Sequence, residues 1–234
     1  MSYLLLRKML LDAADDKQAE ILKRFFRTGK CQYGEGDDFL GIKVPVNRKI
    51  VKNNLDLNTN ELGLLLRSKY HEERLAALFV IVEKYSRASE TEKEEIFDFY
   101  MNNRKGINNW DLVDLSAPAV VGAYLYNKDK SVLFEFAKSR SLWDRRIAVI
   151  STFYFIKKGE FDVTLQIAEI LLKDKHDLIH KAVGWMLREI GKRDLRTEES
   201  FLEKYYKVMP RTMLRYAIEK FPQRKRQRYL KGKI

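Results

Sequence analysis

Cysteine is almost missing from this sequence. Cys31 is the only one among 234 residues, so the chain cannot form a disulfide within itself. Structural disulfides belong to oxidising compartments and are rare in the cytosol. The cysteine content therefore predicts a protein of a reducing compartment, and the cytosol is the expected location.

Long apolar runs are missing as well. No stretch approaches the roughly 20 apolar residues that a membrane-spanning helix needs. The segment from Met1 to Leu11 is apolar, but Arg7 and Lys8 interrupt it and no small-residue cleavage site follows. We therefore expect neither a signal peptide nor a membrane span.

Proline and glycine, which interrupt helices, occur only four and eleven times. Apolar residues recur at helical spacing, and no segment alternates with period two for long enough to predict a strand. One such helical stripe consists of Leu75, Leu78, Phe79 and Val82. We expect about a dozen helices with short connections. The one long loop, from Thr28 to Pro45, is a candidate functional segment.

Acidic residues are outnumbered by basic ones. Lysine and arginine number 45 against 33 aspartates and glutamates, which gives a formal net charge of +12. An excess of this size favours a polyanionic partner, with nucleic acid first and an anionic membrane surface second. A basic protein without such a partner is the alternative.

A repeat of 36 residues runs through the chain. Arg74 and Arg146 begin similar helical segments 72 residues apart, Trp110 lies halfway between them, and Ala182 lies 36 residues beyond Arg146. This spacing is typical of helix-pair repeats, and the tetratricopeptide signature is absent. The sequence predicts an all-α, HEAT-like helical-repeat solenoid with a concave basic groove. We expect a single domain over residues 1–234 that ends in a basic segment, residues 223–234.

Equivalent positions of successive repeats lie along one ridge of such a stack. This ridge would carry Arg74, Trp110, Arg146 and Trp185, the last about one turn from Ala182. Arginine and tryptophan in a row suit the lining of an anion-binding groove, because a guanidinium binds two phosphate oxygens at once. An internal ion pair of Arg146 with Asp144 or Glu72 is the alternative.

Residues 108–114 read Asn-Asn-Trp-Asp-Leu-Val-Asp and place Trp110 and Asp114 on one helix face, at i and i+4. An aromatic plate beside a carboxylate suits a cationic or positively developing group. In the alternative, Trp110 anchors the core and Asp114 is a surface or capping residue. Pro118 would kink or restart the helix in either case.

Residues 176–189 contain two further features. Gly184 within a helix costs about 1 kcal/mol relative to alanine, which predicts the close approach of another helix or of a ligand. Trp185 beside it fits a core position equally well. His176 and His180 have a spacing that metal ligands use, but no glutamate or third ligand accompanies them. We expect no metal site, and we expect His176 near a helix N-terminus.

The C-terminal residues 223–233 carry six cations and no acid. The cluster includes Arg224, Lys225 and Arg226. It is either a solvated tail or, next to a basic groove, a source of further phosphate contacts.

Taken together, these segments resemble the AlkD-type DNA alkylation repair family, which consists of HEAT-like-repeat DNA glycosylases. The resemblance runs from about Phe25 to Phe221 and rests on four motifs in matching order and spacing. The motifs are Tyr33-Gly34-Glu35-Gly36-Asp37-Asp38-Phe39-Leu40-Gly41-Ile42, Trp110-Asp111-x-Val113-Asp114, Trp143-x-x-Arg146-x-Ala148 and Lys181-Ala182-Val183-Gly184-Trp185-x-Leu187-Arg188-Glu189.

The resemblance implies that Asp114 is the catalytic carboxylate and that Trp110 and Trp185 contact the sugar. It implies that Arg146 lies on the phosphate side, and that Tyr33 lies near the lesion if the loop is shifted by a residue or two. One tryptophan of the family's Trp-Trp pair is Asn109 here. The candidate DNA contacts are Arg146, Arg74, Tyr33, Lys181, Arg188, Arg224, Lys225 and Arg226.

The implied function is a DNA glycosylase of base excision repair. It would hydrolyse the N-glycosidic bond of cationic purines alkylated at N3 or N7 in duplex DNA, without flipping the lesion into a deep pocket. The alternatives are a non-catalytic relative that binds branched or damaged DNA and a protein-interaction solenoid. We expect no cofactor, since the hydrolysis involves no redox change. We also expect a monomer in the bacterial cytosol, at the nucleoid, with double-stranded DNA and no membrane as partner.

Overall fold

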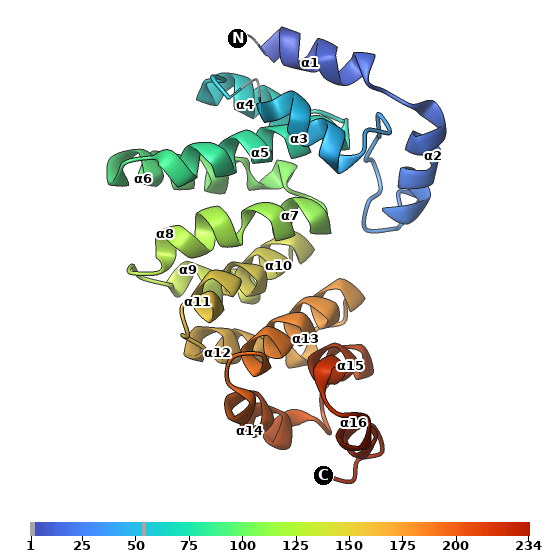
Figure 1. Ribbon diagram of the computed structural model, residues 1–234, viewed down its shortest axis with the longest axis vertical. Helices are drawn as coiled ribbons and strands as arrows, with labels where there is room; N and C mark the ends of the chain where they lie inside the picture. The colour runs from blue at the N-terminus through green and yellow to red at the C-terminus, as the bar shows by residue number, and fades with distance from the viewer. Residues whose placement is uncertain (1–2, 53–54) are drawn as a thin grey trace. The chain divides into compact units, whose positions relative to one another are not determined.

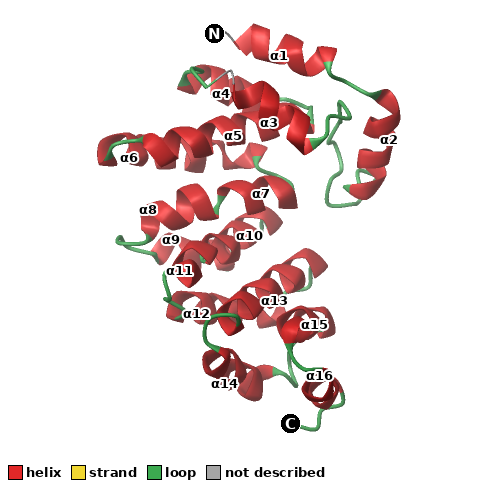
Figure 2. Ribbon diagram, viewed as in Figure 1, coloured by secondary structure: helices red, strands yellow, loops and turns green. Residues whose placement is uncertain are grey.

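The computed structural model describes residues 3–52 and 55–234, and most of these residues are helical (Figures 1 and 2). They contain no strand. One isolated β-bridge joins Asp38 to Tyr70. The all-α expectation is therefore confirmed. The chain divides into two compact units, residues 1–120 and 121–234, and each is described by itself.

The first unit begins with α1, α2 and α3, and a long loop separates α2 from α3. Its remaining helices are packed in sequence order, with α4 against α5 and α5 against both α6 and α7. The helices are α1 (Tyr3–Asp12), α2 (Asp16–Phe25), α3 (Val44–Lys52), α4 (Thr59–Leu66), α5 (His71–Arg87), α6 (Glu90–Asn103), the 3-10 turn η1 (Arg104–Gly106) and α7 (Trp110–Ser116).

The second unit follows a π-helical turn, η2 (Pro118–Gly122), which begins at the proline expected to restart the helix. In this unit α10 packs against α13, and α13 packs against α15. The elements are α8 (Ala123–Leu125), α9 (Ser131–Ala137), α10 (Leu142–Ser151), α11 (Phe153–Lys157), α12 (Asp162–Ile170), η3 (Leu171–Lys173), α13 (Asp177–Gly191), α14 (Leu195–Tyr205), α15 (Arg211–Ala217), η4 (Ile218–Lys220) and α16 (Gln223–Leu230).

Short polar side chains at the N-termini determine where several helices begin. Asn58 and Ser89 each form a capping box, with Glu61 and Glu92 respectively, at the starts of α4 and α6. In a capping box two otherwise unsatisfied backbone N–H groups are satisfied reciprocally. Many helices of this chain are shorter than the roughly 12–15 residues that an isolated helix needs in water. Tertiary packing therefore maintains them.

Gly184 shows how closely the helices of the second unit approach each other. A Cβ atom on Gly184 would lie 2.4 Å from the carbonyl oxygen of Met213 and 2.5 Å from the Cβ of Tyr216, both on α15. The glycine therefore allows α13 and α15 to pack closely, as expected from its position within a helix. Of the two alternatives expected for Gly184, another helix or a ligand, the structure shows a helix of the same unit.

One expected segment boundary is different in the structure. Helix α3 begins at Val44, so the long loop ends at Lys43 rather than at Pro45. Most of the basic C-terminal segment forms α16 (Gln223–Leu230), whose buried Tyr229 packs edge-on against Phe221 and Tyr206. No helix among the described residues is long and apolar enough to cross a membrane. The single domain and the concave basic groove stay predictions.

Candidate active site

Helix α7 carries the first candidate pair, Trp110 and Asp114. The helix begins at Trp110, whose backbone N–H donates to the side chain of Asn109 at 2.8 Å. Asp114 follows one turn later, and both side chains are half-buried. Residues four apart on a helix are neighbours on its surface. The expected arrangement on one helix face is therefore confirmed.

The environment of Asp114 includes a buried phenol. Tyr100 is fully buried, and its hydroxyl lies 2.9 Å from the Ser116 hydroxyl. The Ser116 hydroxyl donates to the carbonyl of Leu112 at 2.6 Å. Burial raises the pKa of Tyr100, and the negative charge of Asp114 raises it further. The phenol next to Asp114 therefore stays neutral at physiological pH.

The ring of Trp110 belongs to an aromatic cluster made of Phe25, Phe26, Phe39, His71 and Trp110. Trp110 stacks on Phe26 with ring centres 5.4 Å apart, and Phe26 stacks on Phe39 at 5.1 Å. Phe25 stands edge-on to Trp110 at 6.0 Å. Both arrangements are favourable for aromatic pairs. The cluster connects α7 to the end of α2 and to the long loop.

A buried polar network lies beneath this cluster and consists of Asp37, His71, Arg74, Asn109 and Asp111. Asp37 of the loop accepts from Asn109 Nδ2 at 3.0 Å and pairs with Arg74 at 2.7 Å. His71 Nδ1 lies 3.4 Å from Asp37, and its Nε2 lies 2.8 Å from Asp111 Oδ2. These contacts join the loop, α5 and α7 through charged groups.

The protonation state of His71 follows from its two carboxylate partners. Burial lowers the pKa of His71, but the charge of Asp111 and the hydrogen bonds to Asp111 and Asp37 outweigh this effect and raise it to about 9. Burial raises the pKa of Asp37. Hydrogen bonds from His71 and Asn109 and the charge of Arg74 outweigh this effect and leave the pKa of Asp37 below its usual value. His71 is thus an imidazolium that donates from both nitrogens at neutral pH.

Glu72 holds the loop to α5 through backbone groups. Its buried carboxylate accepts from the N–H groups of Leu40, Gly41 and Ile42 at 2.9, 2.9 and 3.1 Å. Gly41 has φ of +83°, and a Cβ there would lie 2.0 Å from the carbonyl oxygen of Asp15. The carboxylate of Glu72 therefore holds the loop against the start of α5.

Arg74, which was expected on the ridge as a DNA contact, lies in the buried polar network. The residue is 3% exposed, pairs with Asp37 and donates to the carbonyls of Ser68 and Lys69 at 2.9 and 3.3 Å. Removing these internal acceptors would leave the buried guanidinium charge uncompensated, which is costly. Arg74 therefore belongs to the buried network, and its contact with DNA stays a prediction.

Asp37 and His71 were not identified as site residues from the sequence alone. Asp37 lies in the acidic stretch of the loop, and His71 lies beside Glu72 and Arg74 at a helix start. Charged residues that are expected to be buried need partners of the opposite charge. His71 and Arg74 could have been paired with the acidic loop on this ground, but no pattern indicated which carboxylate would meet which cation.

In the second unit, Arg146 of α10 is also buried. It is 4% exposed, and its Nη1 donates to the carbonyl of Leu178 at the start of α13, at 2.6 Å. Trp185 on α13 is half-buried, lies 5.7 Å from the ring of Phe153, and donates from Nε1 to Glu189 at 3.2 Å. Both side chains thus have partners within their own unit.

The remaining candidate DNA contacts differ in their exposure and in their acidic partners. Arg224 is exposed, Arg226 is half-buried, and Lys181 pairs with Asp177 at 2.7 Å. Arg188 pairs with Glu219, and Lys225 pairs with Glu199. Tyr33 in the loop is half-buried, with its hydroxyl 3.5 Å from the carbonyl oxygen of Phe25.

The two histidines of the second unit serve the fold. His176 is the N-cap of α13, and its Nδ1 accepts from the N–H of Leu178 at 3.2 Å. This confirms the expected helix N-terminus. His180 Nε2 lies 2.6 Å from the carbonyl oxygen of Asp174. Within residues 3–52 and 55–234, no group of three or more potential ligands could hold a metal ion.

Comparison with known proteins decides the family. The sequence pattern of the DNA alkylation repair enzyme family matches residues 6–221, which is nearly the whole chain. The chain belongs to this family. No curated protein matches the sequence significantly.

Two solved structures show the fold of this DNA alkylation repair family member. A predicted DNA alkylation repair enzyme from Enterococcus faecalis is similar with a TM-score of 0.70 at 16% identity, covering 90% of this chain and 97% of that one. AlkD2 from Streptococcus mutans is similar with a TM-score of 0.56 at 18% identity, covering 88% and 98%. The helical-repeat fold expected from the 36-residue period is therefore confirmed.

The first unit of this DNA alkylation repair family member contains a cavity of about 310 Å³ next to the aromatic cluster. We call it the aromatic cavity. Its apolar walls include Leu22, Phe25, Phe26, Ile42, Leu75 and Trp110, and its polar lining includes His71, Glu72 and Asp111. It is the place where α7, the buried network and the loop come together.

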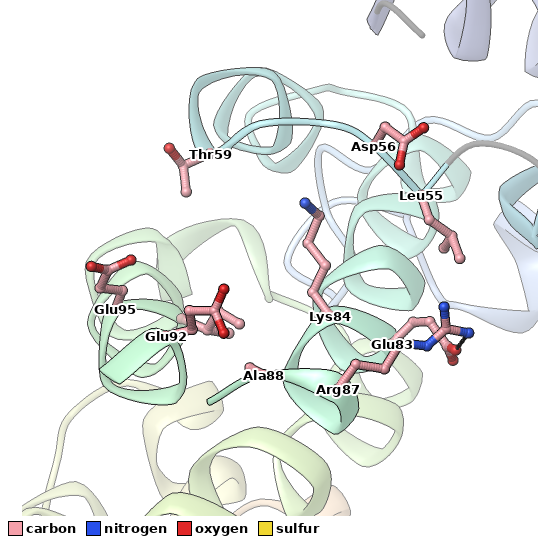
Figure 3. Close-up of a pocket in the computed structure, with 10 residues that line it drawn as sticks. Leu55, Asp56, Thr59, Glu83, Lys84, Arg87, Ala88, Glu92 and Glu95 are labelled. Atoms are coloured by element: carbon pink, nitrogen blue, oxygen red, sulfur yellow. Dashed lines mark hydrogen bonds and ion pairs between the residues drawn. The ribbon is translucent and has the colours of Figure 1, made fainter. Parts of the chain in front are cut away.

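A second cavity, of about 390 Å³, is lined by residues of α5 and α6 and of the segment that leads into α4 (Figure 3). Three of its charged side chains have structural partners. Glu83 pairs with Arg87, and Glu92 belongs to the capping box of α6. We assign no functional role to this cavity.

Proposed function

We propose that this chain is a DNA glycosylase that releases cationic purines, alkylated at N3 or N7, from duplex DNA. The bond hydrolysed is the N-glycosidic bond between the purine and C1′ of deoxyribose. The proposal assigns Asp114 as the catalytic carboxylate, with Trp110 and Trp185 as sugar contacts and Arg146 as a backbone contact.

One observation carries the proposal. A tryptophan and a carboxylate stand one turn apart on α7, and both are half-buried rather than fully enclosed in the core. A carboxylate in a partly dry environment stabilises a developing positive charge more strongly than one in water. The indole face attracts the same kind of charge.

The chemistry needs little more than this pair. An N3- or N7-alkylated purine carries a positive charge, so it leaves with the bonding electrons as a neutral base. The sugar develops oxocarbenium character at C1′, which a carboxylate stabilises as in glycoside hydrolysis generally. A water molecule then bonds to C1′, and its proton passes to Asp114 or to solvent. No metal or redox cofactor takes part in these steps.

The DNA contacts that we propose are Arg146, Tyr33, Lys181, Arg188, Arg224, Lys225 and Arg226. Several of these cations pair with surface acids, and phosphate oxygens can replace those acids with the same geometry. Each cation that engages a phosphate also releases a counterion, so binding would weaken as salt is raised. We propose that the protein binds double-stranded DNA as a monomer.

A second candidate function is the binding of branched or damaged DNA without catalysis. The burial of Arg74 and Arg146 favours it, because two arginines expected on the DNA-facing ridge make internal contacts instead. In that case the exposed cations of α16 and the loop would carry recognition.

Base release by the Asp114→Asn variant separates the two functions. Wild-type protein and variant are incubated with duplex DNA that contains 7-methylguanine, without added metal, and free base is quantified. We expect the variant to bind the duplex like the wild type but to release base at least about a hundredfold more slowly. Equal release by both proteins would remove Asp114 from the mechanism. Binding without release by the wild type would support the second function.

A further inference from the structure

Helix α11 of the second unit places an aromatic ring and a lysine directly beside Trp185. Phe153 is the first residue of α11, and its ring lies 5.7 Å from the ring of Trp185 on α13, against which α11 packs. The ammonium group of Lys157 lies over the Phe153 ring, 4.4 Å from its centre. Both rings are half-buried and Lys157 is exposed. Trp185, Phe153 and Lys157 are therefore consecutive neighbours on the surface of this unit.

The two lysines at the end of α11 carry charges that the fold does not neutralise. Lys157 and Lys158 are exposed, and neither forms an ion pair with a carboxylate of the described residues. Glu160, the acid nearest to them in the sequence, accepts a hydrogen bond from the Tyr126 hydroxyl at 2.8 Å. By contrast, three of the cations proposed above as DNA contacts on α13 and α16 pair with acids. The lysines of α11 can thus bind an anion without displacing a carboxylate.

Aromatic faces hold these ammonium groups in place. Lys158 lies over the ring of Tyr154 at 5.7 Å, and Lys130, from the turn between α8 and α9, lies over Phe155 of α11 at 5.6 Å. A ring face attracts an ammonium group at such distances. A free lysine side chain loses rotamer entropy when it binds a ligand, so prior placement reduces this cost. The ammonium group has three N–H donors, which leaves donors for an anion on the side away from the ring.

We infer that Lys157 and Lys158 bind phosphate groups of the DNA strand that flanks the alkylated nucleotide. The inference rests on the proposed function, in which Trp185 contacts the deoxyribose. The two distances along Trp185, Phe153 and Lys157 place the ammonium group at most about 10 Å from the Trp185 ring, which corresponds to about three nucleotides of a strand at roughly 3.4 Å of rise each. A strand whose sugar lies on Trp185 thus has phosphates within reach of α11. Neither the resemblance nor the contacts proposed above assign a role to these two lysines.

The first test is the salt dependence of binding. The probe is a duplex with a tetrahydrofuran in place of the alkylated nucleotide, which has a sugar ring but no base to release. Fluorescence anisotropy gives its Kd over a range of salt concentrations. We expect Lys157→Gln to reduce the slope of log affinity against log salt by about 0.9, the value for one phosphate contact, and the double variant Lys157→Gln/Lys158→Gln to reduce it by about 1.8. Lys157→Arg, which keeps the charge, should keep the slope.

Lys138→Gln is the matched control. Lys138 is exposed at the C-terminal end of α9, so its replacement removes the same charge from the same unit away from the end of α11. This variant should bind the duplex with the slope of the wild type. Circular dichroism checks that all variants fold.

A second test locates the phosphate. A neutral methylphosphonate replaces, one at a time, each phosphate within about three nucleotides of the tetrahydrofuran. With the unmodified duplex, the wild type should bind several-fold more tightly than Lys157→Gln. This difference should disappear at the linkage that Lys157 binds and persist at the others, because only there has the DNA already lost the partner of the lysine.

An unchanged slope in Lys157→Gln, or an equal fall in Lys138→Gln, overturns the inference. A difference between wild type and Lys157→Gln that no methylphosphonate removes overturns it as well. Release of 7-methylguanine by the wild type is measured separately and reports on the proposed function. Base release without an effect of the α11 variants keeps the glycosylase function and removes the inference. Binding that depends on Lys157 without base release keeps the phosphate contact and removes the glycosylase function.

Discussion

His71 at the first position of α5 holds Asp111 of α7 across 2.8 Å, from Nε2 to Oδ2. Its other ring nitrogen faces Asp37 of the long loop at 3.4 Å. One imidazolium therefore joins three segments that are far apart in the sequence. The third of them, α7, carries Trp110 and Asp114, so the geometry of the candidate active site depends on the protonation of His71.

Replacing His71 by glutamine should destabilise the first unit in a pH-dependent way. The pKa of His71 is raised to about 9 from an ordinary value of 6.5, so its contribution is complete below pH 6.5 and is lost as the pH rises through 9. We expect the difference in free energy of unfolding between wild type and His71→Gln to be on the order of 2–3 kcal/mol at pH 6. At pH 10 the difference should largely vanish.

Urea unfolding at both pH values measures this difference. His180→Gln is the control, because the His180 ring bonds a backbone carbonyl within the second unit. A difference between wild type and His71→Gln that does not change with pH would show that His71 acts by packing alone.

Glu198 should make the protein less stable as the pH rises. Burial and the nearby charge of Glu199 raise the pKa of Glu198 to about 8 from 4.5, so the folded state prefers the protonated carboxyl. The stability that comes from this preference is complete below pH 4.5 and is lost as the pH rises through 8. Glu198→Gln, which carries no charge, should therefore be more stable than the wild type at pH 9. We expect a difference of a few kcal/mol in the free energy of unfolding, since one unit of pKa shift corresponds to at most about 1.4 kcal/mol.

Thermal unfolding at pH 5 and pH 9 compares the two proteins, with Glu203→Gln as a control at an exposed position of the same helix. An unchanged difference between Glu198→Gln and the wild type across this range would mean that Glu198 is ionised in the folded protein.

Glu72→Gln should loosen the loop. The two carboxylate oxygens of Glu72 accept hydrogen bonds from three backbone N–H groups. An amide has only one oxygen that can accept, and its NH₂ group would face backbone N–H donors instead. We expect a loss of roughly 2–4 kcal/mol in the free energy of unfolding and faster proteolysis between residues 28 and 43. Limited proteolysis followed by mass spectrometry locates the cuts. Glu83→Gln, at a half-buried position of the same helix, should change neither quantity. Equal proteolysis of both variants would contradict the role of Glu72.

Gly184→Ala should be destabilising although alanine is the better helix former. The intrinsic gain is about 1 kcal/mol, but the new methyl would meet the Met213 carbonyl oxygen at 2.4 Å and force α13 and α15 apart. Overpacking of this kind costs about 1–3 kcal/mol or more. In Gly63→Ala the methyl meets only the flexible end of Arg67, at 3.2 Å, so this variant should be neutral or stabilised. Chemical unfolding of both variants gives the comparison, and a Gly184→Ala variant as stable as the wild type would exclude tight packing at this contact.

The local features of the site could be predicted because they depend on neighbours in the sequence. Trp110 and Asp114 share a helix face, Gly184 marks a close approach, and His176 caps α13, each within a few residues. The partners of Arg74 could not be predicted in this way. Its ion pair with Asp37 spans 37 residues, and many acids along the chain could have taken that place.

The sequence by itself determined the helical class, the repeat and the family of this protein. Apolar spacing, scarce proline and glycine and the 36-residue period act locally or at regular intervals, so they can be read along the chain. Only the tertiary structure decided which charges are buried. Arg74 and His71 find carboxylates in the loop and in α7, because burial of a charge is tolerated only next to an opposite charge. That requirement is met only in three dimensions, where residues far apart in the sequence become neighbours.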